Sequence, residues 1–252
     1  MTARESGDRG VSDLVAFTLT FSVIILSIGV VSVSGISALA EVQTQTQTDA
    51  AEQAMEGLAE TFADHRGDAA PRHVTDLQLS GDNIRRQESY LEVSVNVTGG
   101  GYVNRTVEMG TFVRTSGETT AVAYTSGALF RVQKRGLVVV QRPPFRCDAA
   151  SAHLALVNLR GDTSFSTESA VQVESTREGV SVLYPNVSAG DDPSRGVESV
   201  SVNVSRTRYP DAWERLFEDE LAGWQGSDGR YTCDGIDTAV IRATKVGVRV
   251  VV

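Results

Sequence analysis

The hydrophobic pattern is dominated by an uncharged run near the start of the chain, from Leu14 to Ala40. Its 27 residues exceed the roughly 20 that a helix needs to cross a bilayer. The polar members of the run are serines and threonines, whose hydroxyls can bond to carbonyls of their own helix and are therefore tolerated in lipid. The run predicts a membrane-spanning helix over residues 11–40, after a leader of residues 1–10.

The basic residues around this run predict its orientation. Arg4 and Arg9 precede it, and the first basic residue after it is Arg66. Because basic residues favour the cytoplasmic side, we expect a single-pass protein of the cell membrane, with the N-terminus in the cytoplasm and the head outside.

A second helical pattern follows the apolar run. Ala51, Met55, Leu58 and Phe62 recur at helical spacing, and a glycine at position 67 suits the end of a helix. These residues predict an amphipathic stalk helix over residues 41–67. The Thr-rich part of it, residues 41–48, is compatible with either helix or an extended linker.

The period changes from about Leu77 onward, where apolar residues begin to alternate with polar ones. Residues 91–97 are the clearest example, and such alternation is typical of a strand with one buried face. Further strands are predicted over residues 102–109, 111–115, 120–125, 129–133, 137–141, 153–159, 170–174, 180–184, 197–204, 238–243 and 246–252.

One late helix interrupts this series. Pro210 precedes residues 211–224, in which Trp213, Leu216 and Phe217 mark an apolar face. Many short strands separated by turn residues indicate a sandwich or a curled sheet. The expected fold class is therefore α+β: a long N-terminal membrane-spanning helix, then a mainly antiparallel β-sandwich-like head over residues 68–252.

Composition narrows the function classes. The 252 residues carry a net charge of −9, which disfavours a nucleic-acid partner because the mean field repels a polyanion. Only two of the 23 basic residues are lysines. An acidic chain that is poor in lysine suggests a halophilic host, and a GC-rich genome is the alternative reading of the same bias.

Cys147 and Cys233 are the only cysteines, and both fall in the predicted external head. An oxidising compartment favours a disulfide between them. Two free thiols are the alternative, and a metal pair is disfavoured because no histidine lies at ligand spacing near either cysteine.

Four asparagines lie in Asn-x-Ser/Thr sequons: Asn96, Asn104, Asn186 and Asn203. In an external head they predict N-glycosylation. Alternating strands also produce Asn-Val-Ser/Thr without any sugar, because small polar residues then recur on the exposed face. Asn104 and Asn186 lie nearest to predicted turns.

No recognisable catalytic or cofactor motif stands out. His65, His73 and His153 share no pattern with a nucleophile, and the acids at positions 191–192 and 234–237 suit turns better than a calcium loop. We therefore expect a non-enzymatic protein without a cofactor and without a metal site.

The residues directly before the apolar run are Arg9, Gly10 and Val11. This arrangement resembles the class III signal peptide of archaeal type IV pilins, above all uncharacterised haloarchaeal pilin-like proteins. The resemblance covers residues 1–40. It implies that a prepilin peptidase cuts between Gly10 and Val11 and that the retained helix packs into homo- or hetero-oligomers. Many pilins have glutamate at the fifth mature position, where this chain has Val15, and its nearest acid is Asp13.

The resemblance implies a minor or accessory subunit of a type IV pilus-like surface filament, acting in adhesion or assembly. An alternative is an uncleaved single-pass anchor that carries a non-polymerising extracellular binding domain. A cleaved secretory signal ending at Ala38-Leu39-Ala40 and an anchored hydrolase are further readings.

Overall fold

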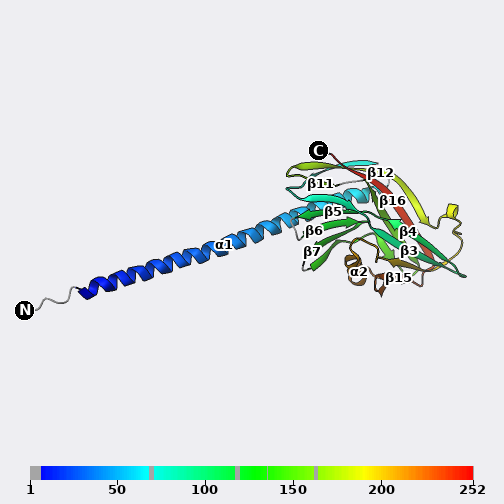
Figure 1. Ribbon diagram of the computed structural model, residues 1–252. Coiled ribbons are helices and arrows are strands. Elements are labelled where there is room, and N and C mark those ends of the chain that lie inside the picture. The colour runs from blue at the N-terminus through cyan, green and yellow to red at the C-terminus, as the bar shows by residue number, and fades with distance from the viewer. Residues whose placement is uncertain (1–6, 68–70, 117–119, 135, 162–163, 252) are drawn as a thin grey trace, which may run out of the picture. The chain divides into compact units, whose positions relative to one another are not determined.

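A computed structural model describes residues 7–67, 71–116, 120–134, 136–161 and 164–251 (Figure 1). The chain forms two compact units, residues 1–48 and 49–252, with the division inside the predicted stalk. Residues 1–6 of the predicted leader, and the side chains of Arg9, Gly10, Val11 and Ala38, lie outside what is described.

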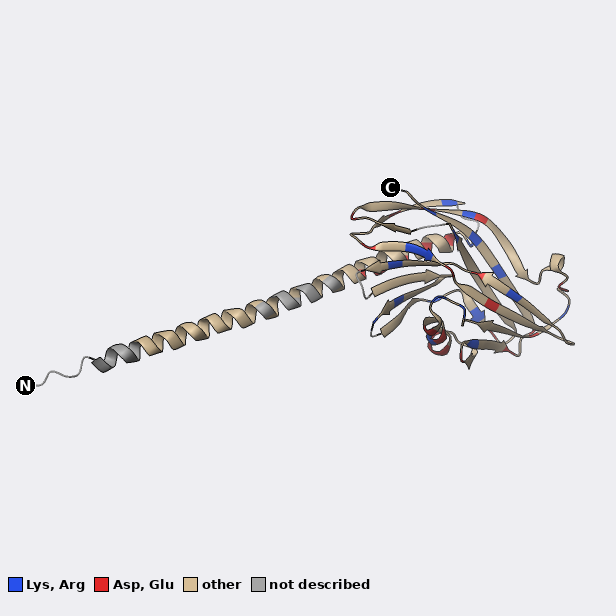
Figure 2. Ribbon diagram, in the orientation of Figure 1, with Lys and Arg blue, Asp and Glu red and all other residues tan. Residues whose placement is uncertain are grey.

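Helix α1 runs from Gly7 to Asp64. Within the described residues it contains the one segment, Leu14–Ser32, that is long and apolar enough to cross a membrane. Figure 2 shows no charged residue along this segment. Its hydroxyls bond to their own helix: Thr18 Oγ1 donates to Leu14 O at 2.6 Å and Ser22 Oγ to Thr18 O at 2.7 Å. The Thr-rich run at 41–48 is helical.

Three sheets are found among the described residues between 71 and 251. In spatial order, sheet A contains β1 (Arg72–Gln78), β12 (Ala170–Tyr184), β16 (Thr238–Val251), β10 (Ser151–Arg160) and β9 (Phe145–Cys147). Sheet B contains β11 (Ser164–Ser166), β2 (Asn83–Gln87), β5 (Thr111–Ser116), β6 (Thr120–Thr125), β7 (Ala128–Gln133) and β8 (Gly136–Gln141). Sheet C contains β14 (Gln225–Ser227), β15 (Arg230–Asp234), β13 (Val197–Asn203), β3 (Tyr90–Val97) and β4 (Tyr102–Glu108).

Strand pairing is antiparallel except between β10 and β16, as far as the described residues show. Two short helices complete the head: η1 (Val187–Ala189) and α2 (Pro210–Asp219). The predicted α+β class, with an N-terminal apolar helix, a mainly antiparallel head and one late α-helix, is confirmed.

The last turns of α1 belong to a core between sheets A and B. Met55, Leu58 and Phe62 are fully buried there with residues of β5, β6, β10, β12 and β16. The Phe62 ring lies 5.0 Å from the Tyr124 ring and 6.2 Å from the Phe112 ring, centroid to centroid. We call this cluster the helix core.

A second core lies among sheet C, α2 and the other half of sheet A. Trp213 and Phe217 of α2 are buried against Phe130, Phe145 and Tyr231, and the Phe217 and Tyr231 rings stack at 4.7 Å. We call this cluster the aromatic core.

Sheet A contributes to both cores through opposite faces. In β10, Leu154 and Leu156 belong to the aromatic core, whereas Val157 and Leu159 belong to the helix core. In β16, Ala243 belongs to the aromatic core and Val246 to the helix core. The parallel register pairs Leu156 with Ala243 and Val157 with Thr244, so both strands change their buried face at one level.

Several predicted boundaries are wrong. The segments predicted at 238–243 and 246–252 form one strand, because β16 continues through the change of buried face. Those predicted at 170–174 and 180–184 also form one strand, β12, with register shifts after Arg177 and Val182. The pattern did not predict β2, β9, β11, β14 or β15, nor most of β1.

The late helix is shorter than predicted, since α2 ends at Asp219 rather than at residue 224. Leu221 N donates back to Leu216 O at 3.1 Å, and Gly223 follows with φ +84°. A Cβ on Gly223 would lie 2.4 Å from Cys147 O, so the chain passes too closely there for another residue type. Trp224 is buried on Phe217 from an irregular segment rather than from the helix.

Candidate functional site

The candidate site is built on the β3–β4 hairpin. The strands join through Gly99, Gly100 and Gly101, whose φ angles are +83°, +92° and +126°. This backbone favours glycine, because other residues rarely adopt positive φ. In β3, the odd residues 91–97 are buried and the even ones face outward, which places Ser94 opposite Asn104 and Asn96 opposite Tyr102 on the outer face of sheet C.

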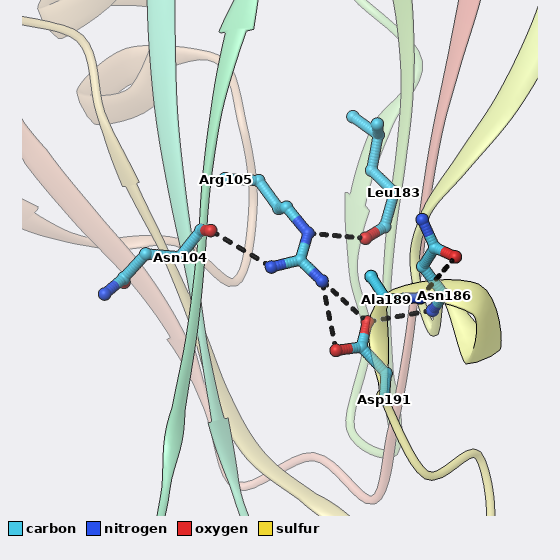
Figure 3. Close-up of polar contacts among 6 residues, drawn as sticks. All are labelled: Asn104, Arg105, Leu183, Asn186, Ala189 and Asp191. Carbon is cyan, nitrogen blue, oxygen red and sulfur yellow. Dashed lines mark hydrogen bonds and ion pairs between the residues drawn. The ribbon is translucent and has the colours of Figure 1, made fainter.

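Arg105 of β4 fastens this hairpin to the segment that follows β12 (Figure 3). Its Nη2 donates to both carboxylate oxygens of Asp191 at 3.0 Å, and its Nε donates to Leu183 O at 3.2 Å. The Asp191 side chain is only 5% exposed. The ionised Asp191 carboxylate is stabilised there because the Arg105 guanidinium and the backbone N–H of Asn186 donate hydrogen bonds in place of water.

The loop after β12 is further ordered by its own contacts. Asn186 donates its backbone N–H to Asp191 Oδ2 at 2.8 Å, and its Oδ1 accepts from Ala189 N at 3.3 Å as the N-cap of η1. From the other end of the loop, Arg195 Nη2 donates to Thr98 O at 3.0 Å and Gly100 O at 3.2 Å. Arg105 of the hairpin therefore bonds to the loop, and Arg195 of the loop bonds back to the hairpin, so two arginines hold the two segments together.

Three of the four sequon asparagines share the outer face of sheet C. Asn96 lies in β3, Asn104 in β4, and Asn203 in β13 opposite Glu92 of β3. Asn186 is the exception and lies beside η1. Asn104 is the exposed member of the set, whereas the other three are partly buried.

The two cysteines form a disulfide between β9 and β15, with an S–S distance of 1.98 Å. The bond joins an edge of sheet A to sheet C. Cys233 is fully buried in the aromatic core.

The residues considered for chemistry do not converge. His153 is exposed on β10. Asp191 is held by Arg105, and Asp192 Oδ1 accepts from Ser194 N at 2.9 Å, as in a turn. Within the described residues, no group of three or more His, Cys, Asp or Glu side chains is placed to hold a metal ion.

A cavity of about 490 Å³ lies beside β12 and β16. Its polar lining includes Glu174, Thr176, Glu178 and Arg249. Glu174 is bonded to Arg72 at 2.8 Å.

His65 and His73 form a pair that sequence spacing does not reveal. Their ring centroids are 4.9 Å apart, and His65 Nε2 lies 2.8 Å from Ser175 Oγ. His65 is fully buried, and burial lowers its pKa from 6.5, with His73 and Arg177 adding to the effect and Asp64 opposing it. The pair lies where α1 ends, beside the helix core.

The Arg105–Asp191 contact was also missed, although the sequence carried a signal that Arg105 needs a partner. In β4 the exposed positions are Tyr102, Asn104 and Thr106, which puts Arg105 on the inward side with Val103 and Val107. An inward charge requires a partner, because an isolated buried charge is very costly.

The model of a family of unknown function, DUF7289, matches residues 9–252. Comparisons with curated proteins and with solved structures gave no match. The matched range includes the apolar helix, the hairpin with Arg105, the loop with Arg195, and both cysteines. The chain therefore belongs to DUF7289, a family of unknown function.

Proposed function

We propose that this chain is a pilin-like surface protein: a single-pass subunit, exposed outside the cell, that serves as a minor or accessory component of a type IV pilus-like filament in adhesion or assembly. The observation that carries the proposal is that one helix, α1, includes both the apolar segment Leu14–Ser32 and the residues Met55, Leu58 and Phe62 of the helix core. Because the end of α1 is part of the core of the head, we expect the apolar segment to stay on the mature chain.

The exposed apolar surface of α1 supports an anchor. Leu14, Phe17, Leu26 and Val31 are each more than 60% exposed in the single chain. Such a surface must be covered by lipid or by other apolar helices. Ala16, Gly29 and Ser34 have small side chains at which neighbouring helices could approach closely.

Arg9, Gly10 and Val11 support processing by a prepilin peptidase, because this junction would leave the apolar helix on the mature chain. The basic residues at positions 4 and 9 support a cytoplasmic N-terminus and an external head. The proposal needs no catalytic residue.

Mass spectrometry of the N-terminus in the membrane fraction tests processing. We expect the mature chain to begin at Val11, and Gly10→Leu to leave the leader attached. Gly7→Leu, a glycine change inside the leader, is the matched control and should be processed normally. A mature chain that begins at residue 1 or 2 would overturn the pilin reading.

A second experiment separates the filament from the alternative, a non-polymerising anchored binding domain. Val15 and Asp13 favour that alternative, because they depart from the common pilin pattern. We expect the protein in filaments sheared from the cell surface. Its confinement to the membrane fraction after processing at Val11 would support the anchored domain instead.

A further inference from the structure

We propose that the outer face of sheet C carries N-linked sugar, that Asn104 is its principal acceptor, and that the Tyr102 ring packs against the first sugar. The inference rests on the proposed function in one respect, because it requires the head to lie outside the cell.

The outer face of sheet C carries charged residues such as Glu92, but it also contains an uncharged row. One row across all five strands consists of uncharged polar residues in register: Gln225, Thr232, Ser201, Ser94 and Asn104. Ser201 Oγ and Thr232 Oγ1 lie 2.9 Å apart within it. A row of neutral side chains places no charge beside a bulky neutral substituent on Asn104.

Three of the sequon asparagines use their amides inside the protein. Asn96 Nδ2 donates to Glu198 Oε2 at 2.9 Å, and Asn203 Oδ1 accepts from Ser205 N at 2.9 Å. Asn186 Oδ1 caps η1. An enzyme that must draw the amide into its own site would first break these bonds, which costs free energy.

Asn104 lacks these obstacles. It is exposed on β4, which is an edge strand of sheet C, and no hydrogen bond to its side-chain amide is found in the part of the chain that the structure describes. Thr106, the hydroxyl residue of its sequon, is exposed on the same face. Amide and hydroxyl can therefore be reached together without disturbing the fold.

The reaction is a glycosyl transfer from a lipid-phosphate-linked oligosaccharide. The Asn104 Nδ2–C1 bond forms as the bond between C1 and the phosphate oxygen breaks. The amide loses one proton, and the lipid phosphate leaves with the electron pair of the broken bond. A membrane-bound transferase of the host supplies the catalysis.

Tyr102 is placed to hold the product. Its side chain is 73% exposed, and it lies two residues before Asn104 on the same face of the same strand. An exposed aromatic face can pack against the C–H groups of a sugar ring, since part of that ring is apolar. The sugar would also cover β4, whose unpaired backbone groups could otherwise pair with another chain.

Glycopeptide mass spectrometry of the full-length protein, purified from membranes of a host that glycosylates its surface proteins, tests the acceptor. Asn96 and Asn104 share the tryptic peptide 87–105, so fragmentation that keeps sugar on its asparagine is needed. We expect sugar on Asn104, and its loss in Asn104→Gln and in Thr106→Ala. Thr106→Ser, which keeps the hydroxyl, should retain it, as should Asn96→Gln, Asn186→Gln and Asn203→Gln.

An unmodified Asn104 in the wild type would overturn the inference. On the same cells, the N-terminus and the accessibility of the head to added protease are measured. If Asn104 is unmodified although the head is accessible and the chain begins at Val11, the glycosylation inference is wrong and the proposed function stands. If the head is protected from protease, the external location is wrong, and the glycosylation inference is wrong with it.

The role of Tyr102 is tested by thermal unfolding of glycosylated protein. The wild type should melt about 2 °C or more above Asn104→Gln, the shift that roughly 1 kcal/mol gives in a domain of this size. The difference should vanish when both proteins also carry Tyr102→Ala and persist with Tyr102→Phe. An undiminished difference with Tyr102→Ala would rule out the ring contact.

Discussion

Arg105 Nη2 reaches both carboxylate oxygens of Asp191 at 3.0 Å, across the 86 residues that separate them in sequence. Arg105 is 25% exposed and Asp191 only 5%. The contact joins sheet C to the loop that leaves sheet A, and through Asn186 N it also orders η1.

Arg105→Met should therefore destabilise the head. The change keeps most of the apolar stem but leaves Asp191 nearly buried without its cation, and we expect a loss of about 2 to 3 kcal/mol. Chemical unfolding of the full chain in detergent measures this loss, with fluorescence from Trp213 and Trp224, which both lie in the head.

Arg72→Met is the matched control. Arg72 Nη2 donates to one carboxylate oxygen of Glu174 at 2.8 Å, but Arg72 is 61% exposed, and the loss should stay below about 1 kcal/mol. Equal losses would contradict our interpretation.

Phe62→Ala should destabilise the head more than any surface change. It removes a fully buried ring that contacts Phe112 and Tyr124, and such truncations cost about 3 to 5 kcal/mol. Phe62→Leu keeps much of the volume and should cost less than half as much. The same unfolding assay separates the two, and a cost near zero for Phe62→Ala would mean that α1 is not packed in the helix core.

The stability of the head should fall as the pH drops below 6.5. Burial lowers the pKa of His65 in the folded chain. Between that lowered pKa and 6.5 the unfolded chain therefore binds a proton that the folded chain does not. The free energy of unfolding then decreases by up to about 1.4 kcal/mol per pH unit.

Unfolding at pH 7.5 and at pH 5.5 measures this dependence. His65→Gln, which can still bond to Ser175, should weaken it. His153→Gln, which replaces an exposed histidine on β10, is the matched control. A pH dependence that is the same in His65→Gln and the wild type would assign the effect to other groups.

Loss of the disulfide should lower stability without changing the fold. Cys147 and Cys233 close a loop over 86 residues, and releasing it in a Cys147→Ser, Cys233→Ser chain should cost about 4 to 5 kcal/mol in the chain-entropy model. Thermal unfolding with and without reductant measures the same effect in the wild type. The double variant should show no response to reductant.

The strands that the sequence predicted well are those with one buried face along their whole length. In β3 every second residue from Leu91 to Val97 is buried, and strict alternation revealed it. In β16, Ala243 and Thr244 are both buried, because the strand passes there from one core to the other. The alternation breaks at that point, and the pattern predicted two strands where there is one.

The candidate site was less predictable, because it depends on contacts between distant segments. Alternation in β3 and β13 indicated that Asn96 and Asn203 lie on exposed faces, but only the register of β4 places Asn104 beside Ser94. The partner of Arg105 is 86 residues away in a loop without regular pattern, so no local signal identifies it.

The change of buried face in sheet A limits how this head can be divided. Since β10 and β16 each supply side chains to both cores, a fragment that contained one core would expose apolar residues of the other. The part of the head around the helix core and the part around the aromatic core therefore do not form separate modules that could be exchanged one at a time. Variation among relatives should therefore concentrate in the turns and on the outer faces of the sheets, where a substitution touches neither core.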